Sequence, residues 1–141
     1  MLSRRLLRVK VAKALYAHLK SGSDNLKASE KNLVESIDKA YDLYFQMMSF
    51  VVEVANYAEN RIELNKQKKL PTYEDLNPNR RFVDNPVIHL IANSDSVNDF
   101  LAKRKLSWSQ HQDAVKDVYN RLVEAEFYQK YMSASINTFT N

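Results

Sequence analysis

The chain contains no cysteine and very little glycine or proline. Its 141 residues include one Gly and three Pro. The lack of cysteine excludes disulfides, Cys-ligated zinc and thiol catalysis, and it fits a reducing cytoplasm, where we expect the protein to be located. A single glycine excludes the glycine-rich loops that bind phosphates. The scarcity of turn-forming residues argues against β-sandwiches and barrels, which change direction roughly every ten residues.

Long apolar segments are missing as well. No stretch approaches the roughly 20 apolar residues that a membrane-spanning helix needs, so we expect no membrane partner. Hydrophobic residues nevertheless make up 45% of the sequence. A chain of this length can bury roughly two thirds of the surface that it exposes when unfolded. The sequence therefore predicts one folded domain over residues 1–141.

Positive charge is concentrated at the N-terminus. The first 23 residues contain six Lys or Arg and no Asp or Glu, whereas the remaining residues sum to −2. A local block of positive charge usually binds a polyanion, so this segment indicates binding to nucleic acid or to an acidic membrane surface.

The hydrophobic pattern predicts an all-α fold that begins with two helices over residues 1–64. Residues 3–20 form the first, with Leu7, Val11 and Leu15 directed to the core and Gly22 at its C-terminal end. Apolar residues then recur at three- and four-residue steps, without Pro or Gly, through about ten turns. This pattern predicts one very long second helix.

The rest of the chain is predicted to be a long polar loop followed by shorter helices. Residues 65–85 contain Pro71 and Pro78. They also contain a second group of cations, namely Lys66, Lys68, Lys69, Arg80 and Arg81. Residues 86–133 carry capping residues and short apolar repeats. Together with the N-terminal helices they predict a helical bundle.

Sequence signals for catalysis and metal binding are absent. The three histidines lie far apart, and neither His-Glu-x-x-His nor Glu-x-x-His occurs. No serine lies in a nucleophile motif. His18, on the apolar arc of the first helix, is best explained as a hydrogen-bonded core residue. We therefore expect no enzyme activity, no catalytic residue, no cofactor and no metal site.

The first helix is the strongest candidate for a binding site. Arg4 and Arg8 are four residues apart and project to the same side, while Arg5, Lys13 and Tyr16 occupy a neighbouring arc. Arginine presents a planar fork to phosphate oxygens, and a tyrosine ring can stack on an unpaired base. This combination suits single-stranded RNA better than a duplex. A solvated basic face with Tyr16 packed into the core would produce the same pattern.

Residues 4–16 resemble the opening helix of the NusB family of transcription antitermination factors, which has an arginine-rich run followed by Gln-Ala-Leu-Tyr. Ala14-Leu15-Tyr16 matches that ending, and Lys13 replaces the Gln. Segments 40–44 and 72–79 resemble the divergent, longer members of the Bacteroidetes, of which this chain would be the N-terminal half. The Ile-Leu-Arg-Leu-Ala-like helix of the family's second half has no counterpart here.

The resemblance implies a NusB-like helical fold and an RNA-binding function. Family members bind a boxA-like single-stranded RNA together with a small-subunit ribosomal protein, and the complex modifies RNA polymerase for antitermination during ribosomal RNA synthesis. By position, Arg4, Arg5, Arg8 and Tyr16 match the family's RNA-contacting helix, and Lys13 is a basic substitute there, so the resemblance implies that these five residues bind RNA.

Two other functions fit the sequence. A helical protein-interaction module without nucleic-acid binding would use the apolar segment 47–52 and the Tyr-rich second helix. A membrane-surface protein would use the first helix as a basic amphipathic anchor, although its apolar face lacks Trp and Phe.

Overall fold

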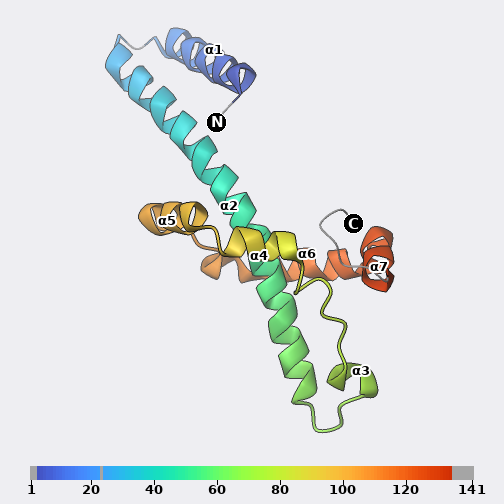
Figure 1. Cartoon of the computed structure of the whole chain (residues 1–141). Helices are drawn as coiled ribbons and strands as arrows, with labels where there is room; N and C mark the ends of the chain where they lie inside the picture. Colours follow the sequence, from blue (N-terminus) through green and yellow to red (C-terminus); the bar gives the residue numbers. More distant parts are fainter. Residues whose placement is uncertain (1–2, 23, 135–141) are drawn as a thin grey trace. The chain divides into compact units, whose positions relative to one another are not determined.

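The regular structure of the chain is helical throughout the part that the computed structural model describes, residues 3–22 and 24–134 (Figure 1). The all-α class is therefore confirmed, as is the very long second helix, which runs for 41 residues. In chain order the elements are α1 (Arg4–Ser21), α2 (Leu26–Lys66), α3 (Tyr73–Leu76), α4 (Pro86–Ala92), α5 (Asp95–Arg104), the 3₁₀ turn η1 (Ser109–His111), α6 (Gln112–Glu124) and α7 (Glu126–Ser133).

The chain divides into two compact units, and the boundary lies inside α2. The first unit is Met1–Phe45 and the second is Gln46–Asn141. The two units share one continuous helix, α2. Each unit is described separately below.

The first unit is a hairpin formed by α1 and the N-terminal part of α2. Ser3 caps α1, because its hydroxyl accepts a hydrogen bond of 3.2 Å from the backbone N–H of Leu6. Gly22 ends the helix in the left-handed conformation, with φ of 60°, as the sequence predicted. The side chain of Asn25 caps the start of α2 by accepting from the N–H of Ala28 at 3.0 Å. No described residue of this unit is buried.

The second unit contains the hydrophobic core. Val115 of α6 is fully buried, and the indole N–H of Trp108 donates to the carbonyl of Gln46 at 2.9 Å. Phe50 of α2 lies against the Trp108 ring, with centroids 4.5 Å apart. The remaining buried hydrophobic residues come from α2, the loop before α4, and three later helices: Val54, Ala55, Ala58, Val83, Ile88, Val97 and Tyr128.

The predicted loop at 65–85 is ordered by short-range caps. Thr72 and Asp75 exchange side-chain and backbone hydrogen bonds in a capping box, which starts the one-turn helix α3. At the far end, the side chain of Asn85 accepts from the N–H of Val87 at 2.9 Å, and Pro86 occupies the first turn of α4.

Candidate nucleic-acid interface

All five sequence-predicted RNA-binding residues are exposed on α1. Arg4, Arg5, Arg8 and Lys13 are open to solvent, and the side chain of Tyr16 is 65% exposed. The alternative in which Tyr16 packs into the core is therefore wrong. By helical geometry the five residues are spread over about half of the helix circumference, on the side away from Ala14.

No acidic side chain that the structure describes neutralises the four predicted RNA-binding cations of α1. Across residues 3–22 and 24–134, no carboxylate forms an ion pair with any of the four. The first turn of α1 also contains no acidic residue. Cations at the positive end of a helix dipole each cost about 0.3–1 kcal/mol at low salt. An anion bound beside them removes this cost, which is one physical reason to regard them as a binding site.

The side of α1 that contacts α2 differs from the one predicted. Leu7 is only half-buried, and Val11 and Leu15 are 40% and 55% exposed. The contact is centred instead on Lys10, Ala14 and His18. Compared with the prediction, α1 is therefore rotated about its own axis so that the face with Lys10 meets α2. The prediction of a buried Leu7–Val11–Leu15 face was wrong for a physical reason, since polar contacts rather than leucines orient the hairpin.

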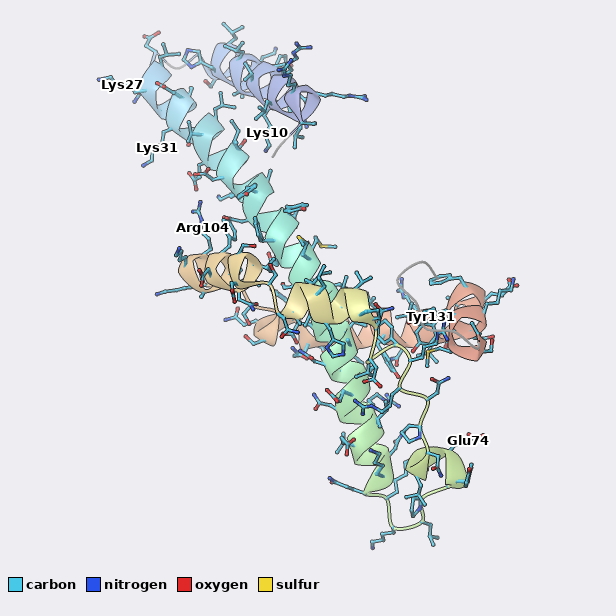
Figure 2. The ribbon with its side chains drawn as sticks, viewed as in Figure 1. Lys10, Lys27, Lys31, Glu74, Arg104 and Tyr131 are labelled. Carbon is cyan, nitrogen blue, oxygen red and sulfur yellow. The ribbon has the colours of Figure 1, made fainter. Side chains whose placement is uncertain are left out.

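Two polar contacts hold this hairpin together. The ammonium of Lys10 donates to the backbone carbonyl of Ser36 at 2.7 Å and to its hydroxyl at 3.1 Å, and Figure 2 shows Lys10 on the side of α1 that faces α2. About two turns further along the hairpin, His18 Nδ1 and Ser29 Oγ share a hydrogen bond of 2.9 Å. His18 is thus satisfied by a hydrogen bond, as the sequence suggested, although it is half-buried rather than in a core.

A groove runs along each side of this line of contact. The first, which we call the lysine groove, has a volume of about 530 Å³ and is lined by residues that include Val9, Lys10, Lys13, Ala17, Asn32 and Ser36. The second, which we call the leucine groove, has a volume of about 220 Å³ and is lined by residues that include Val11, Leu15, Leu26, Glu30 and Leu33. Ala14, His18, Ser29 and Leu33 line both grooves and so separate them.

The two grooves differ in charge. Two lysines and no acidic residue line the lysine groove, whereas the leucine groove has a glutamate and no lysine or arginine. Lys13 belongs both to the lysine groove and to the exposed cationic surface of α1. The sequence reasoning missed this groove, because Asn32 and Ser36 carry no motif and only the docking of α1 brings them near Lys13.

The second basic group, in residues 65–85, is largely neutralised within the second unit. Lys66 pairs with Glu63 at 2.8 Å, and Lys68 pairs with Asp75 at 3.1 Å. A backbone hydrogen bond from Thr72, together with Lys68, lowers the pKa of the Asp75 carboxyl. Lys66 and Lys68 thus have carboxylate partners, which Arg4, Arg5, Arg8 and Lys13 lack among the described residues.

Arg80 and Arg81 also have internal partners. Arg80 bonds to Glu59 at 2.9 Å and to Asp84 at 3.2 Å, and these two carboxylates raise the pKa of its guanidinium. Arg81 is buried, lies 4.7 Å from the centroid of the Tyr131 ring and donates to the carbonyl of Ala134 at 2.6 Å. Tyr131 returns a hydrogen bond of 3.1 Å to the Arg81 carbonyl.

Comparisons with known proteins identify no relative. No protein-family model matches the chain, and no curated protein or solved structure does. The likeness to the NusB family therefore depends on the residues quoted above alone. In the part of the chain that the structure describes, no helix is both long and apolar enough to cross a membrane. No group of three or more His, Asp or Glu residues among those described could hold a metal ion.

Proposed function

We propose that this chain is an RNA-binding transcription antitermination factor of the NusB type that acts in the cytoplasm. It would bind a boxA-like single-stranded RNA together with a small-subunit ribosomal protein, as part of an RNA polymerase antitermination complex. The observation that supports this best is the surface of α1, where four cations and Tyr16 are exposed and no described carboxylate pairs with the cations.

The chemistry of α1 suits a flexible anionic strand. The guanidinium groups of Arg4, Arg5 and Arg8 can each hold phosphate oxygens with two parallel N–H donors. Lys13 adds a point charge about one and a half turns beyond Arg8, and the Tyr16 ring offers a stacking surface for an unpaired base. Because all five side chains come from one helix, the surface is present before the RNA binds.

Titration of a boxA-like RNA at two salt concentrations tests the proposal. If the four cations each displace a counterion from single-stranded RNA, the slope of log K against log[salt] is about −3. Between about 50 and 200 mM salt the affinity should then fall by roughly 50-fold. Binding that does not respond to salt contradicts the proposal.

Charge reversal locates the site. The triple variant Arg4→Glu, Arg5→Glu, Arg8→Glu should lose roughly 100-fold or more in affinity while circular dichroism shows unchanged helix content. A matched control reverses three exposed cations of the second unit, namely Lys103, Lys116 and Arg121. Both variants lower the formal charge from +4 to −2. Equal losses in the two variants would mean that only the net charge matters and that α1 is not the site.

A helical protein-interaction module is the second candidate, and the leucine groove is the observation that favours it. Leu15 and Leu26 line this groove and are more than half exposed, as is Met47 in the predicted apolar segment 47–52. Sedimentation at increasing protein concentration separates the two functions. Self-association without any RNA binding would favour the interaction module.

A further inference from the structure

We infer that the lysine groove between α1 and α2 accepts one unstacked nucleobase of the bound RNA, with Asn32 contacting the base edge and Lys13 the adjoining phosphate. This inference rests on the proposed RNA-binding function and deepens it, because it extends the site from the exposed half of α1 into a specific cavity. Nothing in the five sequence-predicted residues by itself points to such a pocket.

The groove has the composition that a base requires. Its aliphatic lining, which includes Val9, Ala17 and Leu33, can contact the faces of a planar ring. Its polar side chains come from both helices, and on the α2 side Asn32 and Ser36 lie one turn apart. An asparagine amide both donates and accepts, so it can form paired hydrogen bonds with a base edge.

The charges of the groove favour an anionic ligand, such as a nucleotide, over a cationic one. With two lysines and no acidic residue in its lining, the lysine groove attracts a phosphate. The leucine groove on the other side of the hairpin contains Glu30 and no lysine or arginine, and it would repel one. The hairpin thus offers a nucleotide a single favourable side, and that side is continuous with the cationic surface through Lys13.

The groove is held open by the contacts that dock α1. Figure 2 shows that Lys27 and Lys31 lie on the side of α2 that is turned away from α1, so they do not enter the groove. Lys10 donates to the carbonyl and the hydroxyl of Ser36 with two of its three N–H donors. Lys10 therefore fixes one end of the groove and leaves one donor for a ligand. Ala17 is exposed and lines only the lysine groove, so a larger residue at this position fills the cavity without entering a core.

The test combines groove variants with single-abasic RNAs, measured by fluorescence anisotropy with the full chain. The probes are a labelled boxA-like single-stranded RNA and its derivatives that each lack one base. Wild-type protein should lose about 5- to 100-fold in affinity for the derivative that lacks the inserted base. Ala17→Phe should lose a similar factor with the intact RNA, and the same abasic derivative should cost it nothing further. This loss of additivity is the signature of a base inside the groove.

Two controls separate a base contact from general electrostatics and from misfolding. Ala17→Ser keeps the cavity open and should bind like wild type, and Asn120→Ala on the exposed surface of α6 is the matched control for Asn32→Ala. Asn32→Ala should weaken binding without changing the salt slope, whereas Lys13→Ala should reduce the slope by about 0.7.

The outcomes distinguish this inference from the proposed function. If wild-type protein binds RNA with the expected salt dependence but Ala17→Phe and Asn32→Ala bind equally well, the groove inference is overturned and the RNA-binding function stands. If no RNA binds to wild type, both are overturned. Fully additive losses from Ala17→Phe and every abasic substitution also overturn the inference, because they show that no base occupies the groove.

Discussion

The two units of the chain use their charges in opposite ways. Residues 1–45 contain nine Lys and Arg against five Asp and Glu, and residues 46–141 contain twelve of each. In the first unit, the arginines of α1 are exposed without carboxylate partners among the described residues, whereas in the second unit Arg80 is ion-paired and Arg81 is buried. The same kind of sequence signal, a cluster of cations, therefore has a different meaning in each unit. What differs is whether the fold brings acidic or aromatic side chains to the cations.

The largest effect on stability is expected at Arg81, and its neighbour Arg80 provides the comparison. Arg81→Ala removes the contact with the Tyr131 ring and leaves the carbonyl of Ala134 without its charged donor, so the free energy of unfolding should fall by about 3 kcal/mol. Arg80→Ala removes exposed ion pairs and should cost less than about 1 kcal/mol. Urea unfolding measures both. Equal losses of unfolding free energy in the two variants would show that the buried contacts of Arg81 contribute no more to stability than the exposed ion pairs of Arg80.

A matched pair of valines tests where the core lies. Val115→Ala creates a cavity at a fully buried position and should lower the free energy of unfolding by about 2 kcal/mol. Val11→Ala, at a 40% exposed position on α1, should change it by less than about 0.5 kcal/mol, since alanine also has the higher helix propensity. A large cost at Val11 would mean that the first unit has a core that the hairpin does not reveal.

Two exposed tyrosines sharpen the comparison for binding. Tyr16→Ala should weaken RNA binding by about tenfold through loss of one stacked base, and it should leave stability unchanged because the ring is 65% exposed. Tyr73→Ala on α3 is the control, since that ring is also exposed but lies in the second unit. RNA titration of the two variants side by side is the measurement. A comparable loss at Tyr73 would place the RNA on more than α1.

The last effect is expected only at alkaline pH and only in the second unit. Burial raises the pKa of Tyr128 to about 12, from an ordinary value of 10. The folded protein therefore keeps this phenol proton more tightly than the unfolded chain does, so the contribution to stability is complete below pH 10 and is lost as the pH rises toward 12. Phenolate absorbance against pH, compared with Tyr128→Phe, follows this transition. A Tyr128 that ionises near pH 10 would contradict the buried position.

Most of the secondary structure could be predicted because its causes are local. Gly22, Pro86 and the capping residues act within a few positions of themselves, and the long α2 follows from an uninterrupted three- and four-residue repeat. The face of α1 that docks on α2 could not be predicted. Leucines suggested one face, but contacts from Lys10 to Ser36, 26 positions away, select another.

The candidate site was predicted only in part for a similar reason. Exposure of Arg4, Arg5, Arg8, Lys13 and Tyr16 follows from their position on one helix that buries nothing. The neutralisation of the second basic group depends on partners such as Glu59, which is 21 positions from Arg80. Neither that pairing nor the lysine groove has a signature in the local pattern.

The sequence by itself determined the helices, their caps and the excess of positive charge in the first unit, because each depends on neighbouring residues or on composition. The tertiary structure alone decided which cations remain available, which side of α1 meets α2 and which polar side chains line the lysine groove. These depend on contacts between residues 11 to 53 positions apart, and the free energy of such contacts exists only once the chain has folded.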